Sequence, residues 1–194
     1  MARKLVFQFG VVALTSVVLF GCQSQKMNMD DMMKPAVRPL ELDHLNMFLG
    51  TWEGMADITM AGSEKVEQHK GKITYEWMLD KWVLVERDEY EMGEGKTGYM
   101  TGYWRWDPDE QNFNMVWFCS DGGFGSGVAR YNEQTKTWTF KGKSNNPYQH
   151  MKTLGEGKMT FVDDKTIEWT WEEDLAGLFG GKDFMEMKGT LHKQ

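Results

Sequence analysis

The stretch Thr51–Met60, TWEGMADITM, alternates between two kinds of side chain. Its even-numbered positions carry tryptophan, glycine, alanine, isoleucine and methionine, whereas its odd-numbered positions include Glu53 and Asp57. A period of two is typical of a β-strand with one buried face. We therefore predict a half-buried strand that begins close to Trp52 and turns this tryptophan inward.

The same alternation recurs along most of the chain. Lys72–Leu79, KITYEWML, and Lys165–Glu173, KTIEWTWEE, both place aromatic side chains at every second position. Compact turn signals such as Asp107–Glu110 separate the segments. Further strands are predicted at Trp82–Met92, Thr97–Asp107, Asn112–Ser120, Gly127–Asn132, Thr135–Lys143, Tyr148–Val162 and Lys182–His192.

About ten short strands without helical segments between them predict an all-β, antiparallel meander. Such a meander closes into a barrel or folds as a sandwich, and we favour the barrel. Glu41–Leu49 precedes the strands and has leucines on one side, which predicts a short N-terminal helix. The predicted domain therefore spans residues 41–194.

The N-terminus has the pattern of a signal peptide. Arg3 and Lys4 precede an apolar stretch, Leu5–Phe20, which is shorter than the about 20 residues of a membrane span. The tetrapeptide Leu19–Cys22 resembles the lipobox of bacterial lipoproteins, in which the cysteine is acylated and becomes the mature N-terminus. This resemblance implies that residues 1–21 are removed and that Cys22 carries acyl chains that hold the protein on a membrane.

Gln23 and Ser24 follow the cysteine, where retention in the inner membrane usually requires an aspartate. The resemblance therefore implies an outer-membrane location, facing the periplasm or the cell surface. Removal of Arg3 and Lys4 leaves 20 basic and 29 acidic residues. An acidic body without basic clusters argues against nucleic acid as a partner. With Cys22 acylated, Cys119 has no cysteine left to form a disulfide.

Residues 22–40 read as a flexible, methionine-rich tether, because they include prolines and lack a periodic apolar pattern. The segment MNMDDMM has four methionines beside two aspartates. Thioether ligands select Cu(I), so a copper site remains an alternative to a plain linker. The four candidate ligands are Met27, Met29, Met32 and Met33.

A short helix that leads into Gly50-Thr51-Trp52 resembles the opening of the calycins, the superfamily of the lipocalins. The longer run from Gly98 to Lys143 resembles a bacterial branch of lipocalin-like domains of unknown function. These resemblances imply a barrel with an internal cavity and place Trp52 at the closed end of that barrel. They do not imply a reaction.

Strand parity predicts which side chains face the interior. The predicted inward set contains Ile58, Tyr75, Trp77, Trp117, Trp138, Phe140, Trp169, Trp171, Met185 and Met187, together with Trp104 and Trp106. Side chains alone fill some small barrels, whereas others hold one small ligand. As ligand-binding candidates we take Tyr75, Trp77, Trp104, Trp117, Trp169 and Trp171, with His69 and Arg105 for a polar end of the ligand.

The related nitrobindins bind haem through a histidine on the last strand. Here the only histidine of that segment is His192, which has outward parity, so no cofactor is expected. The four histidines, His44, His69, His150 and His192, show no zinc spacing. No nucleophile lies beside a base, and the acidic runs Asp88–Glu89 and Glu172–Asp174 look like solvated strand faces, so we expect no catalysis.

The leading hypothesis is a lipid-anchored envelope protein that binds a small apolar or amphipathic ligand in its barrel. The alternatives are a filled barrel that serves as an interaction module and a methionine-rich copper-binding protein. Val116 and Phe118 give one strand an apolar outer face, which leaves a homodimer open. Leu175, Leu178 and Phe179 lie between the last two strands, as a lid over a cavity or as part of the core.

The lipobox resemblance makes a prediction about processing. A Cys22→Ser substitution removes the acceptor sulfur, so the precursor should stay uncleaved and should incorporate no labelled palmitate in its bacterial host. Cys119→Ser is the matched control and should be acylated normally. Palmitate labelling of the Cys22→Ser protein at the wild-type level would contradict the lipoprotein hypothesis.

Overall fold

The computed structural model describes residues 34–176 and 182–194. The chain divides into two compact units, Met1–Val37 and Arg38–Gln194, and the second contains the whole barrel. This unit begins slightly before the predicted residue 41. Arg38 belongs to it because its Nε donates a hydrogen bond to the Lys81 carbonyl at 2.7 Å and its Nη1 pairs with Asp43 at 2.7 Å. Cys22 and the four tether methionines lie outside the described residues.

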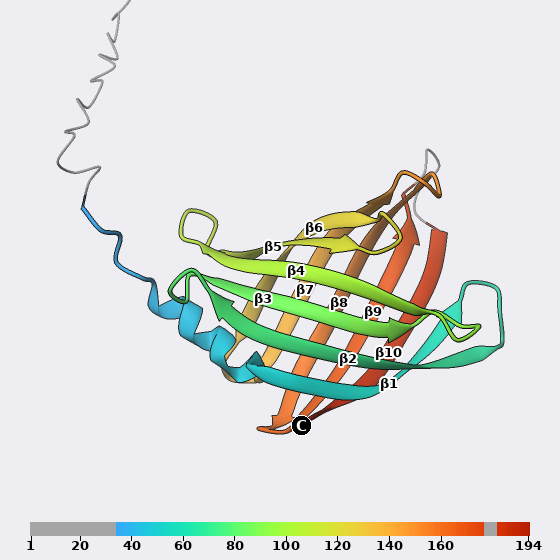
Figure 1. Ribbon diagram of the computed structural model, residues 1–194, viewed down its shortest axis with the longest axis horizontal. Coiled ribbons are helices and arrows are strands. Elements are labelled where there is room, and N and C mark those ends of the chain that lie inside the picture. Colours follow the sequence, from blue (N-terminus) through green and yellow to red (C-terminus); the bar gives the residue numbers. More distant parts are fainter. Residues whose placement is uncertain (1–33, 177–181) are drawn as a thin grey trace, which may run out of the picture. The chain divides into compact units, whose positions relative to one another are not determined.

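Ten antiparallel strands form one closed barrel, which confirms the predicted fold class (Figure 1). Each strand pairs with its neighbours in sequence, and β1 also pairs with β10, so the sheet has no free edge. Only turns and short loops separate the strands from β1 to β9. Their bounds are β1 Gly50–Met60, β2 Val66–Met78, β3 Val83–Glu91, β4 Thr97–Asp107, β5 Asn112–Cys119, β6 Phe124–Asn132, β7 Thr137–Asn146, β8 Met151–Asp163, β9 Thr166–Leu175 and β10 Lys182–Lys193.

The predicted strand bounds differ from the observed ones by one to three residues at most strand ends, and by six residues at the start of β2. Strand β2 begins at Val66, six residues before the predicted start, and β6 begins at Phe124 instead of Gly127. Residues 66–70, VEQHK, are exposed or half-buried and carry no apolar alternation. Their strand conformation comes from pairing with β1, which a single-sequence pattern does not reveal.

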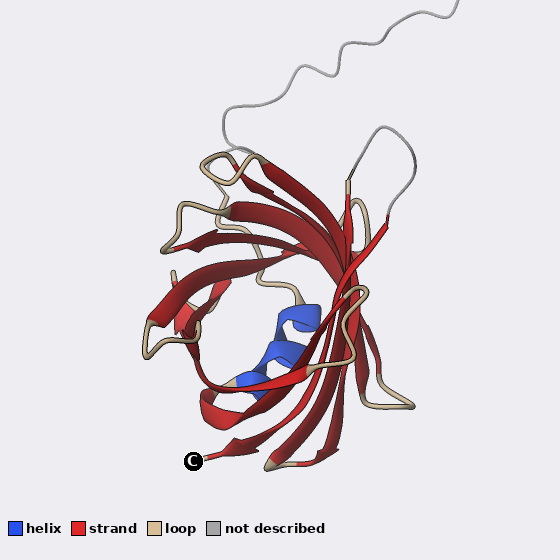
Figure 2. Cartoon of the chain, turned by 90° about the vertical axis from the view of Figure 1, so that its right-hand side faces the viewer, coloured by secondary structure: helices blue, strands red, loops and turns tan. Residues whose placement is uncertain are grey.

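The short helix η1, Leu40–Phe48, is a 3-10 helix that lies within the ring of strands at one end of the barrel (Figure 2). Leu42, Leu45 and Phe48 are fully buried on one side of it. The Trp52 indole donates to the Phe48 carbonyl at 2.6 Å and is itself inaccessible to solvent. The predicted place of Trp52 at the closed end is therefore confirmed.

Aromatic side chains fill the barrel beside η1. The Phe48 ring contacts Tyr75, Trp104, Trp138 and Phe161, with ring centroids 5.1 to 5.3 Å apart. We call this region the closed half. Its buried side chains are Leu42, Leu45, Phe48, Trp52, Tyr75, Leu84, Trp104, Phe113, Met115, Ala129, Trp138, Phe140, Phe161, Ile167 and Leu191.

In the part of the chain that the structure describes, no helix is long and apolar enough to cross a bilayer.

Phe48 should be the most sensitive contact between η1 and the strands. Phe48→Ala removes a ring that touches four other rings, so we expect the free energy of unfolding to fall by about 3–5 kcal/mol. Leu40→Ala, in the same helix but 79% exposed, should change it by less than about 0.5 kcal/mol. Chemical denaturation of both variants measures the difference, and equal small losses would show that η1 does not close the barrel.

Candidate functional site

Three indole rings pack against the barrel wall at glycines, where the wall has no side chain. The Trp117 ring occupies the space that a β-carbon on Gly125 would need, with ring atoms 2.2 to 2.5 Å from that position. Trp171 lies in the same way over Gly155. The indole nitrogen of Trp169 comes within 2.8 Å of the β-carbon position at Gly189. These glycines let large rings line the wall closely.

The barrel beyond the closed half is incompletely filled. Its inward side chains are half-buried, although every strand beside them is paired on both edges. Solvent therefore reaches most of them from the interior, whereas Trp169 also lines a groove on the outer face. We call this region the open half and define it by Ile58, Asp88, Met100, Trp117, Cys119, Ser144, Trp169, Trp171, Glu173, Met185 and Met187.

Glu86 lies at the boundary between the two halves and is buried. It accepts hydrogen bonds from the Tyr75 hydroxyl at 2.9 Å and from the Trp104 indole at 2.8 Å. Burial raises the pKa of Glu86, and the two hydrogen bonds oppose that change. The pKa of Tyr75 is raised well above its ordinary value, first by burial and then by the Glu86 charge.

Asp88 follows Glu86 on the same face of β3 and lies at the floor of the open half. Its neighbours across the sheet are Met100 on β4 and then Cys119 on β5. The Oδ1 atom of Asp88 is buried and has no hydrogen-bond donor among the described residues. Burial, together with the Glu86 charge, raises the pKa of Asp88 well above its ordinary value.

Glu173 brings a second carboxyl group into the open half from β9. It accepts a hydrogen bond from the Thr153 hydroxyl at 2.8 Å. Burial raises its pKa. The Cys119 thiol interacts electrostatically with both Asp88 and Glu173, and its pKa is raised to about 11, mainly by burial. The thiol is therefore protonated and unreactive at neutral pH. Because Asp88 and Glu173 both interact with it, these two carboxyl groups lie in the same region.

A second unpaired polar atom is the Nε1 of Trp169, which is buried without an acceptor within the described ranges. Buried donors without partners are rare and usually have an explanation such as an unseen water or ligand. The open half thus combines apolar rings with two polar atoms that the described chain leaves unsatisfied.

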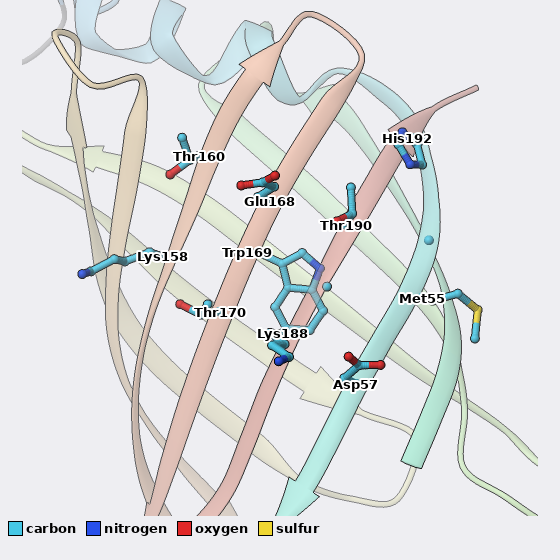
Figure 3. A pocket seen from close by; sticks show the side chains of 12 residues that line it. Met55, Asp57, Lys158, Thr160, Glu168, Trp169, Thr170, Lys188, Thr190 and His192 are labelled. Carbon is cyan, nitrogen blue, oxygen red and sulfur yellow. The ribbon is translucent and has the colours of Figure 1, made fainter. Parts of the chain in front are cut away.

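A groove of about 660 Å³ lies on the outer face of the barrel (Figure 3). Apart from Trp169 and two glycines, its lining comes from outward-facing positions of β1, β8, β9 and β10. These polar side chains face water, so none of them requires a ligand. We therefore place the candidate site inside the open half. The labelled groove residues are Met55, Asp57, Lys158, Thr160, Glu168, Trp169, Thr170, Lys188, Thr190 and His192.

The predicted ligand-binding residues separate into distinct places. Trp117, Trp169 and Trp171 lie together in the open half. Tyr75 and Trp104 belong to the aromatic packing of the closed half.

Trp77 also lies at the closed end. It donates to the side-chain oxygen of Asn46 at 2.9 Å, and the Arg38 guanidinium lies 5.2 Å from its ring. These contacts hold η1 in place and leave Trp77 away from the open half.

His69 has inward parity and is half-buried near the end of β2. Its ring nitrogens lie 3.0 Å from the Glu91 carbonyl and 3.4 Å from the Glu67 carboxylate. The prediction that Arg105 contacts the ligand was wrong. This residue is exposed on the outer face and pairs with Asp107 at 3.3 Å, because odd positions of β4 point away from the interior.

The prediction that both acidic runs are solvated was wrong for Asp88 and Glu173. Glu89 and Glu172 do point outward and are exposed, but Asp88 and Glu173 have inward parity. Glu86 was not recognised from the sequence at all. A parity count on each strand identifies all three carboxyl groups, since Glu86 and Asp88 share a face with Leu84, and Glu173 shares one with Trp171.

His192 is exposed on the outer face of β10, as its parity predicts. A haem inside the barrel therefore cannot take its iron ligand from this histidine. Within residues 34–176 and 182–194, no group of three or more histidine, cysteine, aspartate or glutamate side chains is arranged to hold a metal ion. Leu175 is exposed at the end of β9, and Leu178 and Phe179 lie outside the described residues.

No protein-family model and no curated protein sequence matches the chain. Solved structures share its fold. The crystal structure of Rv2717c from M. tuberculosis matches with a TM-score of 0.62 and 15% identity, over 81% of this chain and 99% of that one. The S-type phycobiliprotein lyase CPES from Guillardia theta matches with 0.53 and 9% identity, over 82% and 98%. These matches show the fold alone, a closed antiparallel β-barrel.

The unpaired Asp88 makes a prediction about the pH dependence of stability. Its folded pKa lies above the ordinary value of 3.8, so the folded state binds the proton more tightly than the unfolded chain. Stability is therefore lost as the pH rises from about 4 through the folded pKa. Asp88→Asn should raise the free energy of unfolding at pH 8 by about 1–3 kcal/mol and should weaken this pH dependence.

Glu89→Gln is the matched control, because Glu89 is the exposed neighbour of Asp88 on the outer face. It should leave the profile of unfolding free energy against pH unchanged. Urea denaturation between pH 5 and pH 8 measures both variants. An Asp88→Asn protein that is less stable than wild type at pH 8, with the full pH dependence, would contradict the assigned environment.

Proposed function

We propose that this protein binds a small amphipathic ligand in the open half of its barrel. The observation that carries the proposal is the difference between the two halves. Rings and η1 fill the closed half completely, whereas solvent reaches the inward side chains of the open half. A mostly apolar cavity with a few polar groups is the usual form of a small-molecule site.

The lining suits a ligand with one apolar and one polar part. The apolar contacts come from the three indoles and from Ile58, Met100, Met185 and Met187. Methionine side chains adapt to ligands of different shape. Ser144, Asp88 and Glu173 supply polar contacts, and the Asp88 carboxyl group has an oxygen without a hydrogen-bond donor in the described chain.

We further propose that the barrel works at the cell envelope, anchored by acyl chains on Cys22. The support is the signal-peptide pattern and the Leu19–Cys22 resemblance to the lipobox. A lipid-anchored barrel on the periplasmic or outer side of the outer membrane would hold its ligand close to a bilayer.

A second candidate function is an interaction module. The outer face of β4, β5 and β6 exposes Tyr99, Val116, Phe118 and Phe124, with exposed fractions of 53%, 42%, 57% and 45%. Phe118 lies opposite Phe124 across the β5–β6 pair, so these two rings are neighbours. Apolar side chains gathered on an outer face favour a protein partner or a second copy of the chain.

Filling the open half should abolish ligand binding. Ser144 faces inward between Gly125 and Thr153, so Ser144→Phe adds a ring to the cavity. We expect this variant to lose the fluorescence enhancement of the neutral apolar probe N-phenyl-1-naphthylamine that wild type produces. Lys143→Phe adds the same ring to the outer face and should bind the probe as wild type does.

Circular dichroism and the denaturation midpoint establish that both variants fold. Equal probe binding by Ser144→Phe and Lys143→Phe would place the probe outside the barrel and contradict the proposal. Absence of probe binding by wild type would favour the interaction module.

A further inference from the structure

The charged groups that face the open half have one sign. Asp88 and Glu173 enter it from β3 and β9, and Glu86 lies at its boundary with the closed half. Among the described strand residues that line this region, none is a lysine or an arginine; at its rim the exposed Glu67 of β2 pairs with Lys65 at 2.7 Å. Lys193 has inward parity but lies over the Trp52 ring at the closed end, 5.3 Å from its centroid. The basic residues of the strands with outward parity are Lys70, Lys72, Arg87, Arg105, Arg130, Lys141, Lys143, Lys152, Lys158 and Lys188.

Several of the outward acidic residues form ion pairs, in contrast to Asp88. Glu89 pairs with Lys72 at 3.4 Å, and Glu156 pairs with Lys141 at 2.8 Å. Asp88 has no ion pair, and its Oδ1 has no hydrogen-bond donor within the described chain. A carboxylate in a region of low polarity is costly unless a counter-charge or a hydrogen-bond donor is supplied.

The indole rings of the open half also attract cations, as its carboxylates do. Trp117 and Trp171 lie with their rings against glycines of the wall, so each ring borders the interior. The face of an indole carries negative potential and attracts cations, most strongly when the cation is desolvated. Quaternary and alkylated ammonium groups are typically bound by aromatic rings and carboxylates together.

We propose that the open half selects its ligand by a positively charged, alkylated ammonium head group, held by Asp88 and Glu173 and by the Trp117 and Trp171 rings. This inference rests on the proposed function and names the chemical class of its ligand. The apolar remainder of the ligand contacts Met100, Met185 and Met187. Burial raises the pKa values of Asp88 and Glu173, as expected for buried carboxyl groups that have no cation beside them.

A metal ion fits the same groups poorly. Two carboxyl groups and a protonated thiol do not make a ligand set for a hard cation, which takes six or more oxygen ligands. The described residues also contain no group of acidic, histidine or cysteine side chains arranged for a metal. Large apolar rings around the carboxyl groups suit an organic cation better.

The test compares three probes of the same length that differ in head-group charge. Decyltrimethylammonium is cationic, decyldimethylamine oxide is its near-isosteric neutral counterpart at pH 8, and decanoate is anionic. Each is titrated into the soluble barrel, residues 38–194, below its micelle-forming concentration, and binding is read by displacement of N-phenyl-1-naphthylamine. We expect the cation to bind about tenfold more tightly than the other two.

Asp88→Asn and Glu173→Gln should each remove most of this preference while N-phenyl-1-naphthylamine still binds. Glu89→Gln and Glu172→Gln, their outward neighbours, should keep it. Equal affinity for the three decyl probes, with normal binding of the naphthylamine, would overturn the cation selectivity and leave the proposed function standing. Failure of wild type to bind any of the four probes would overturn both.

Discussion

A closed sheet of ten strands encloses more space than inward side chains fill. Eight strands give an interior that side chains just fill or that holds one small ligand, and the diameter grows with strand number. This chain therefore needs additional groups to close its barrel. The helix η1 supplies them at one end, where Phe48 packs against four aromatic rings. No described element does the same for the other end.

The division into halves explains the chemistry of the interior. At the boundary with the closed half, the carboxyl group of Glu86 is held by two donors, the Tyr75 hydroxyl and the Trp104 indole. One pleat further along β3, Asp88 has no such donor on its Oδ1. The same strand thus carries one satisfied and one unsatisfied carboxyl group. This change marks the boundary between the closed half and the open half, in which we propose that a ligand binds.

Much of the fold follows from the period-two pattern of the sequence. The bounds of β4 were predicted to the residue, and the parity of Trp117, Trp138, Trp169 and Trp171 placed them on the inner face. The start of β2 was missed because Val66–Lys70 depends on pairing with β1. The site was predicted only in part, since an indole signals burial while an acidic residue in a strand usually signals solvent. Asp88 and Glu173 break that rule, because a wide barrel can hold acidic side chains on its inner face.

The central claim is that one half of this barrel is closed and the other is open to solvent and ligand. Solvent isotope shifts of 5-fluorotryptophan resonances test it most directly, with each resonance assigned by a single Trp→Phe substitution. On transfer from H₂O to D₂O, the account predicts clear shifts for Trp117, Trp169 and Trp171, and almost none for Trp52, Trp104 and Trp138. Absence of a solvent shift at all six tryptophans would show a barrel filled from end to end and would contradict the account.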